Sequence, residues 1–321
     1  MQTTGPMSVN HGSGHIMAIV KRRPRKVYRA IHQAADAQVS SVYRPTLAWV
    51  TALPLNRAGV TDALVVGDTE RAVAAATDWR VQGERLAGKI RPALLRAFQG
   101  GGKASWKETH QTAPGWRFAK QGLSGRFDII NPRVAMWAER NAAELVTRVS
   151  MSSRNGLREL IARAAREGVD LRRNPELIIR LLDDNGALGL DGVRLNAVWN
   201  YRRDQEKRGI APATIEQRVA NLVGRYQQER AHTIARHETM LAANAGQEEA
   251  WDQASDKGLI APGTTREWLT APDERVCPIC RPMSGKTAPR GQTFDTPAGK
   301  VLWPPAHVNC RCTLVLVEPD L

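Results

Sequence analysis

Two short cysteine clusters near the C-terminus decide the architecture of that part of the chain. Cys277-Pro278-Ile279-Cys280 is followed, about 27 residues later, by His307-Val308-Asn309-Cys310-Arg311-Cys312. All four cysteines of the 321-residue protein and one of its seven histidines lie in these clusters. A C-x2-C pair places two thiolates on one tight turn, which suits two corners of a tetrahedral zinc site. The pattern predicts a closed, structural zinc centre.

Five candidate ligands compete for four positions. Cys277, Cys280 and Cys310 are the firmest candidates, and His307 and Cys312 compete for the last place. His307 and Cys310 repeat the short spacing of the first pair. Cys310 and Cys312 are two residues apart and would share one face of a strand, because strand side chains alternate.

Disulfides, inert thiols and a catalytic zinc are the alternatives to a structural metal centre. Disulfides would suit a secreted chain, but we find no apolar signal-peptide core and no transmembrane run. In a reducing cytosol the cysteines would stay thiols, either inert and buried or bound to metal. A catalytic zinc would need an open coordination position and a nearby base, whereas the ligands here are in surplus.

Charge is unevenly distributed along the chain. The formal net charge is +14, which favours acidic partners such as nucleic acid or an acidic protein surface. Residues 1–30 hold six basic and no acidic residues, whereas residues 264–321 hold seven basic and six acidic residues. We therefore expect sequence-independent contacts with DNA phosphates from the N-terminal basic run, Lys21, Arg22, Arg23, Arg25 and Lys26.

The remaining patterns predict an α+β protein that is mostly helical, with a small C-terminal zinc-stabilised module containing β-strands. We expect a disordered basic arm (1–29), an N-terminal helical region with a Gly-rich loop (30–125), a helical body (126–262) and a Cys/His zinc-binding module (263–321). Helical patterns cover 30–53, 69–98, 131–150, 152–168, 175–182, 191–208 and 214–250, and strands are expected at 267–270 and 312–317. The glycines at 100–102 are expected to break the second pattern completely. Fewer than sixty loop-rich residues bury little apolar surface, so the C-terminal module needs a metal clamp.

The longest predicted helix carries polar residues that allow two structural interpretations. His237-Glu238 suggests a zinc protease, but the H-E-x-x-H motif requires histidine where Leu241 stands. Arg236, Glu238 and Asn244 lie among small and apolar neighbours. They would either organise a hydrogen-bonded packing junction or lie on an exposed helix face.

Three passages resemble phage head morphogenesis proteins, the minor head proteins grouped with the F product of phage Mu. They are Asn131-Pro132-Arg133 with Trp137, the Ile234–Gly246 helix, and the stretch from Glu267-Trp268-Leu269-Thr270 through both cysteine clusters to Leu314. The resemblance covers about residues 130–316. His237 departs from the threonine more usual at that position.

The resemblance implies a virion protein without catalytic activity, present in few copies per procapsid and assembled in the host cytoplasm. It implies association with the portal protein and help in head assembly and in DNA packaging or ejection. Further expected partners are the major capsid or scaffold protein and packaged DNA, and no membrane is expected.

Two other functions compete with this one. A sequence-specific zinc-containing DNA-binding protein is disfavoured, because the cysteine module is nearly neutral and lacks a basic recognition helix. A hydrolase could use Cys277 as nucleophile and His307 as base, but this leaves the remaining cysteines without a role.

Overall fold

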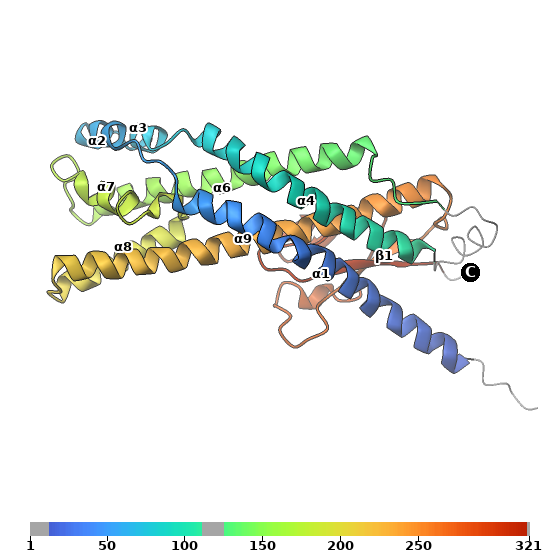
Figure 1. The fold of residues 1–321 in the computed structure, drawn as a ribbon. Coiled ribbons are helices and arrows are strands. Elements are labelled where there is room, and N and C mark those ends of the chain that lie inside the picture. Colours follow the sequence, from blue (N-terminus) through green and yellow to red (C-terminus); the bar gives the residue numbers. More distant parts are fainter. Residues whose placement is uncertain (1–12, 111–124, 320–321) are drawn as a thin grey trace, which may run out of the picture. The chain divides into compact units, whose positions relative to one another are not determined.

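The computed structural model describes residues 13–110 and 125–319 of the chain, with side chains from residue 24 onward. Helices dominate these ranges (Figure 1). They are α1 (Ser13–Thr51), α2 (Arg57–Val65), α3 (Thr69–Ala75), α4 (Trp79–Thr109), α6 (Pro132–Arg166), α7 (Glu176–Leu182), α8 (Gly192–Lys207) and α9 (Pro212–Asp256). Short 3-10 turns lie at Ala187–Gly189 and Arg281–Met283. Within the same ranges, no helix is both long enough and apolar enough to cross a bilayer.

The strands are confined to the C-terminal part of the chain. They are β1 (Thr265–Leu269), β2 (Thr287–Pro289), β3 (Phe294–Thr296), β4 (Gly299–Val301) and β5 (Thr313–Val317). β1 lies between β2 and β5 in an antiparallel sheet, and β3 pairs with β4 as a separate hairpin. Trp268 of β1 is fully buried, with its ring 5.2 Å from that of Phe294. The predicted class, mostly helical with a small C-terminal β region, is confirmed.

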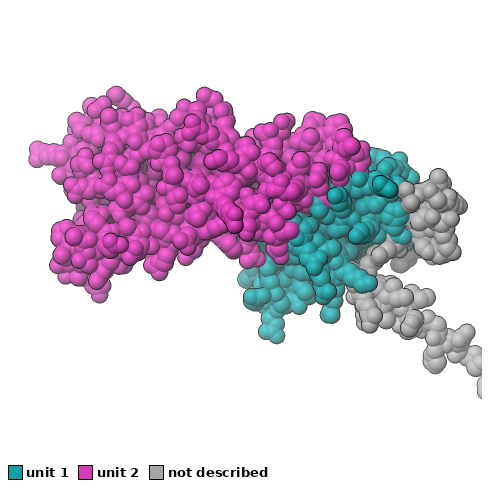
Figure 2. Space-filling model, viewed as in Figure 1, with its two compact units in different colours: residues 1–34, 100–127, 243–321 teal, residues 35–99, 128–242 magenta. Residues whose placement is uncertain are grey.

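The chain divides into two compact units, each assembled from several segments (Figure 2). Unit 1 comprises residues 1–34, 100–127 and 243–321, and unit 2 comprises residues 35–99 and 128–242. Helices α1, α4 and α9 contribute residues to both units. The linear division expected from the sequence does not describe this mixing of distant segments.

The N-terminal arm differs from the sequence prediction. Residues 1–12 lie outside the described part, but helix α1 begins at Ser13, so residues 13–29 are helical and not disordered. Val27, Ile31 and Ala35 recur every four residues on one helix face and are buried. The basic run at residues 21–26, directly before Val27, conceals this short apolar stripe in the sequence.

The prediction that Gly100–Gly102 ends a helix is wrong, because α4 continues through all three glycines to Thr109. A Cβ atom on Gly101 would lie 2.0 Å from the carbonyl oxygen of Ala243 in α9. A Cβ on Gly102 would lie 2.2 Å from the Phe127 ring. The glycines therefore allow close backbone packing within unit 1, a role that outweighs their low helix propensity.

This packing predicts opposite effects for two glycine-to-alanine substitutions in the same helix. Gly101→Ala is expected to lower the free energy of unfolding by about 2–3 kcal/mol, because the added methyl group meets backbone that cannot move aside. Gly88→Ala is the matched control: nothing lies within 4 Å of its Cβ position, so alanine is expected to stabilise the helix by about 0.5–1 kcal/mol. Urea unfolding followed by circular dichroism measures both. A neutral Gly101→Ala would contradict the packing argument.

In unit 2, α6 forms one helix where the sequence predicted two. The Asn131 side chain accepts a hydrogen bond from the Arg133 amide, and Pro132 occupies the first helical position, as expected. Ser153 lies inside the helix, near the expected boundary between the two, and accepts a hydrogen bond from Arg230 of α9 at 2.9 Å. Arg230 also donates to the carbonyl oxygens of Val149 and Gly189. Burial lowers its pKa to about 10.

The polar residues of α9 separate into two classes. Arg236 is exposed, whereas Glu238 and Asn244 are buried. Glu238 accepts hydrogen bonds from Arg148 at 2.9 Å and from Asn141 at 3.4 Å within unit 2. The packing-junction interpretation is confirmed for the two buried residues, and the exposed-face interpretation applies to Arg236.

Candidate metal centre

The first cluster occupies a tight turn before the short 3-10 helix at Arg281–Met283. The Cys280 amide donates to the Cys277 carbonyl oxygen at 3.1 Å and lies 3.4 Å from the Cys277 sulfur. The turn therefore directs two sulfurs to one point.

The second cluster begins with another tight turn. The Cys310 amide donates to the His307 carbonyl oxygen at 3.2 Å, and Asn309 adopts a left-handed conformation with φ of 60°. Asparagine tolerates this conformation better than most residues with a side chain. His307 and Cys310 are brought together by this turn. β5 begins immediately afterwards, at Thr313.

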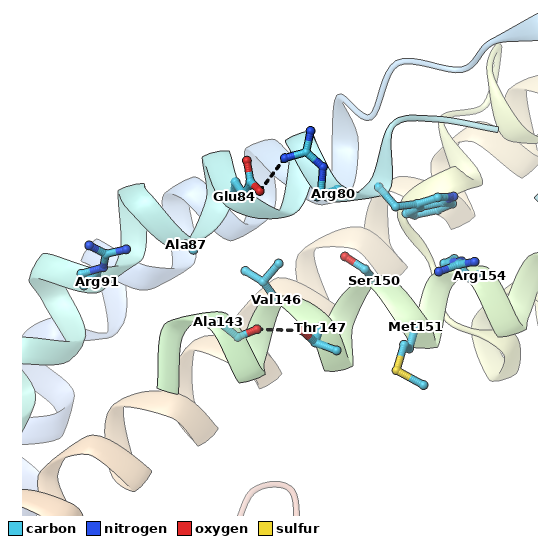
Figure 3. A pocket seen from close by; sticks show the side chains of 11 residues that line it. Arg80, Glu84, Ala87, Arg91, Ala143, Val146, Thr147, Ser150, Met151 and Arg154 are labelled. Atoms are coloured by element: carbon cyan, nitrogen blue, oxygen red, sulfur yellow. Dashed lines mark hydrogen bonds and ion pairs between the residues drawn. The ribbon is translucent and has the colours of Figure 1, made fainter. Parts of the chain in front are cut away.

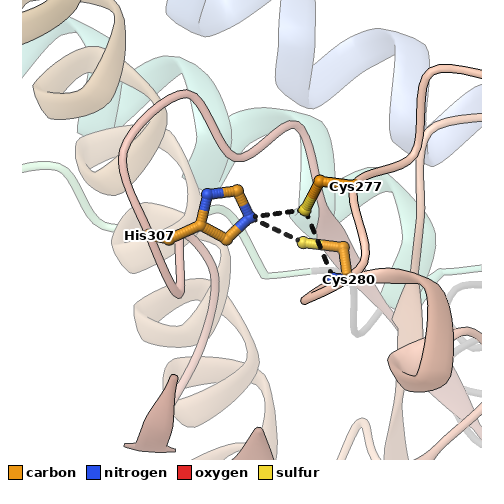
Figure 4. A group of neighbouring side chains, drawn as sticks. All are labelled: Cys277, Cys280 and His307. Atoms are coloured by element: carbon orange, nitrogen blue, oxygen red, sulfur yellow. Dashed lines mark hydrogen bonds between the residues drawn. The ribbon is translucent and has the colours of Figure 1, made fainter. Parts of the chain in front are cut away.

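The two turns bring all five predicted ligands into one cluster. The His307 Nε2 atom lies 3.1 Å from the sulfur of Cys277 and 3.0 Å from that of Cys280 (Figure 4). The sulfurs of Cys280 and Cys310 are 3.7 Å apart. Two overlapping groups result, Cys277–Cys280–His307 and Cys280–Cys310–Cys312, and the ligand atoms of each lie within 4.8 Å of one another. Cys280 belongs to both groups.

The donor set and its spacing fit a tetrahedral metal ion. Zinc–sulfur bonds of about 2.3 Å at tetrahedral angles place two sulfurs about 3.8 Å apart, close to the Cys280–Cys310 separation. The residues enclose a cavity of about 30 Å³, which is large enough for a single small ion or water. The Nδ1 atom of His307 lies 2.7 Å from the Val308 carbonyl oxygen. This contact orients the ring so that Nε2 is free to bind metal. Both groups can hold a metal ion.

The protonation of the thiols follows from their contacts. Hydrogen bonding to Cys310, followed by burial, raises the pKa of Cys280 and of Cys312. Hydrogen bonds accepted from Cys280 and Cys312 lower the pKa of Cys310. Of these three sulfurs, Cys310 is therefore the one that most readily carries the negative charge that a metal ligand needs.

Helix α9 supports the second cluster through buried polar contacts. The Thr313 hydroxyl donates to the Asn244 side-chain oxygen at 2.7 Å and lies 3.0 Å from that of Gln247. The Asn244 and Gln247 amides donate in turn to the carbonyl oxygens of Cys312 and Leu314. These residues fix β5 against α9 and thereby position Cys310 and Cys312.

An ion pair joins the two turns at the edge of the site. The Nη1 and Nη2 atoms of Arg311 both donate to the Asp273 carboxylate, at 2.5 and 2.8 Å. Arg311 also donates to the Arg275 carbonyl oxygen. The Arg311 partner and the Arg275 amide hold the pKa of Asp273 well below its usual range. The pair therefore ties the segment before Cys277 to the segment between Cys310 and Cys312.

Helix α1 also contributes to the surroundings of the cluster. His32 Nε2 lies 3.1 Å from the Arg311 carbonyl oxygen, and Tyr28 stacks on His32 at 4.1 Å. Burial raises the pKa of Tyr28 to about 12, although the nearby Arg311 opposes this shift. Residues far upstream of the cysteines thus pack beside the second cluster, a role that the sequence did not reveal.

The comparison with protein families agrees with this geometry. Residues 203–315 match the model described as Phage Mu protein F like protein. This segment is thus similar to the Mu F-like phage head morphogenesis proteins. It contains all five candidate ligands and the whole of α9. No curated protein and no solved structure gives a significant match.

The other predicted site residues lie N-terminal to the Mu F-like segment. Arg25 and Lys26 are exposed on α1, whereas the side chains of Lys21, Arg22 and Arg23 lie outside the described part. Contact of these residues with DNA stays a prediction.

Arg266 is the main functional residue that sequence reasoning missed in the Mu F-like segment. Its side chain is fully buried and donates to Glu248 at 3.0 Å and to the carbonyl oxygens of Leu302 and Pro289. Its guanidinium carbon lies 5.2 Å from the centre of the Phe294 ring. Arg266 therefore holds the long loop between the two clusters. The sequence did offer one signal of this role. Arg266 lies two residues before Trp268, on the same face of β1, where an apolar residue would be expected.

Proposed function

We propose that the protein is a minor head protein of a tailed phage, a structural component that associates with the portal and assists head assembly and DNA packaging or ejection. The observation that carries this proposal is the family match over residues 203–315. Similarity to a phage head family supports a location in the virion, reached from the host cytoplasm during assembly. The major capsid or scaffold protein is a further candidate partner.

The charge distribution supports contact with packaged DNA. The net charge is +14, and Arg25 and Lys26 are exposed on α1. Such contacts bind phosphates without reading sequence and weaken as salt rises. Sequence-specific recognition is less well supported, because the described part of the cysteine module presents strands and loops after the ligands and no recognition helix.

The site supports a structural role for the metal and no catalytic role. His307 Nε2 is nearly equidistant from Cys277 and Cys280, at 3.1 and 3.0 Å. A catalytic pair would need only one contact between His307 and a nucleophilic cysteine. Contact of His307 with both cysteines is the arrangement expected of three ligands around one metal ion. Zinc held by Cys277, Cys280, His307 and Cys310 would close the two turns and convert its binding free energy into folding free energy.

This ligand choice predicts different results for His307→Ala and Cys312→Ser. His307→Ala is expected to remove zinc, because its Nε2 faces two sulfurs. Cys312→Ser is expected to retain about one zinc per chain, because Cys312 is grouped with Cys280 and Cys310 but not with Cys277 or His307. Elemental analysis of the two purified variants measures the difference. Retention of zinc in His307→Ala and loss in Cys312→Ser would reverse the assignment.

Association with the head is tested in particles. An epitope-tagged copy of the chain is expressed during infection, and procapsids and virions are purified and solubilised without denaturation. We expect the tagged chain in both particles, in few copies, and recovery of the portal protein with it. A tagged chain that lacks residues 200–321 serves as the control. Absence of the chain from both particles would refute the proposal.

A further inference from the structure

A groove runs between α4 and α6, built wholly from unit 2 (Figure 3). The two helices touch where Gly83 faces Val146, and again where the rings of Phe98 and Trp137 lie 4.7 Å apart. Beside this contact they leave a volume of about 470 Å³. This lies within the usual range of about 300–1,000 Å³ for ligand sites.

Two buried polar atoms in the groove lack a hydrogen-bond partner. Ser150 is 8% exposed and its Oγ atom has no partner among the described residues. Figure 3 shows the Ser150 hydroxyl directed toward the gap between the helices. The Nε atom of Arg154, one turn further along α6, is likewise buried and unpaired in the same ranges. Buried polar groups are rarely left unsatisfied, so these atoms indicate a ligand that supplies acceptors.

The groove extends over several helical turns, from Trp79 to Arg91 on α4 and from Ala143 to Arg154 on α6. Ala143, Thr147 and Met151 line the groove and follow one another along a single face of α6 at helical spacing. Met151 is 53% exposed, although it is a large apolar residue. Methionine side chains adapt to varied apolar partners. The α6 side of the groove runs from Ala143 to Arg154, about 17 Å of helix, which suits an elongated occupant better than a compact small molecule.

The rim of the groove is predominantly positive. The lining includes three arginines, Arg80, Arg91 and Arg154, and one acidic residue, Glu84. Arg80 pairs with Glu84 at 2.8 Å, and Arg91 pairs with Glu139 of α6 at 3.5 Å, both exposed. Exposed pairs contribute about 0–1 kcal/mol, so either arginine can exchange its partner for an incoming carboxylate. The lining favours an acidic occupant.

We propose that the α4–α6 groove is a docking site for an acidic amphipathic helix of a partner protein. The apolar stripe of that helix covers Trp79, Val146 and Met151, and its carboxylates meet Arg80, Arg91 and Arg154. An acceptor on the partner satisfies Ser150 and Arg154. Helix-in-groove binding of this kind joins an apolar stripe to a charged rim. The groove lies outside the family match, so the proposal is independent of the role in head assembly.

The test uses the full chain and a panel of labelled model helices, each about 18 residues long. Each helix carries a leucine–alanine stripe and a glutamate face, and a matched helix has the same stripe and a lysine face. Fluorescence anisotropy measures binding. Ala143→Trp fills the groove, and Ala135→Trp makes the same change at another exposed alanine of α6 that does not line it.

We expect glutamate-faced helices to bind the wild type and Ala135→Trp equally. Ala143→Trp is expected to weaken binding at least about tenfold, and higher salt is expected to weaken it in the wild type. Equal binding of the lysine-faced helices, or unchanged binding by Ala143→Trp, would overturn the proposal. Self-association that Ala143→Trp alone abolishes would assign the groove to a second copy of the chain and would also overturn it.

Discussion

Cys280→Ser is expected to unfold the C-terminal module while leaving the helices of unit 2 folded. Cys280 is 3% exposed and is the residue common to both ligand groups. Any set of four ligands without Cys280 would lose its contacts with His307 and Cys310. Structural zinc contributes on the order of 10 kcal/mol in small zinc-dependent domains. Unit 1 has only short strands in this region and cannot replace that contribution by burial.

Limited proteolysis of the full chain measures this effect. New cleavage sites are expected between residues 264 and 319 in Cys280→Ser, and the same sites are expected in the wild type after treatment with a zinc chelator. Cys312→Ser, which we expect to keep its metal, is the matched control. Cleavage of Cys280→Ser identical to that of the untreated wild type would show that no metal stabilises the module.

Arg266→Met is expected to lower the free energy of unfolding by about 3–5 kcal/mol, because it leaves Glu248 buried without its cationic partner. The carbonyl oxygens of Leu302 and Pro289 also lose their donor. Each buried acceptor left without a donor costs about 1–3 kcal/mol when no water replaces the donor, and the costs are not additive. Urea unfolding of the variant measures the total.

The pH dependence of this variant follows from Glu248. Burial raises the pKa of Glu248 to about 7, against an ordinary value of 4.5, although Arg266 opposes the shift. The stability contribution of a carboxyl with a raised pKa is complete below the unfolded pKa and is lost as pH rises through the folded pKa. Removing Arg266 raises the folded pKa further. The defect of Arg266→Met is therefore expected to be larger at about pH 8 than at about pH 6.

A double variant separates the ion pair from its surroundings. Arg266→Met with Glu248→Leu removes both charges, and replacing a buried pair by apolar residues is often close to neutral. We expect the double variant to recover part of the stability lost in Arg266→Met and to lose the pH dependence. A defect of Arg266→Met below about 1 kcal/mol at both pH values would contradict the role assigned to Arg266.

The cysteine cluster could be predicted because its chemistry is local. Each turn requires two residues at short spacing, and the residue types themselves identify the ligands. Helix starts were predicted where a single side chain suffices, as at Asn131 and Asp191, which cap α6 and α8. The resemblance to Mu F-like proteins rested on the same local motifs, and it is confirmed over residues 203–315.

The features that were missed depend on contacts between distant residues. Gly101 resembles a helix breaker until Ala243 is placed beside it, nearly 150 residues later in the chain. Arg266 resembles a solvent-facing residue of a short strand until the loop carbonyl oxygens surround it. Tyr28 and His32 lie beside a basic run, and nothing near them in the sequence indicates packing against Arg311. Tertiary packing outweighs local propensity at each of these positions.

The metal content of the full chain, purified without added metal or chelator, tests the central claim most directly. Elemental analysis is paired with a count of free thiols on the same sample. We expect about one zinc per chain, with the ligand cysteines protected from thiol reagents until a chelator is added. Absence of metal together with four freely reactive thiols would contradict the account, because Cys277, Cys280, His307 and Cys310 would then hold no ion between the two turns.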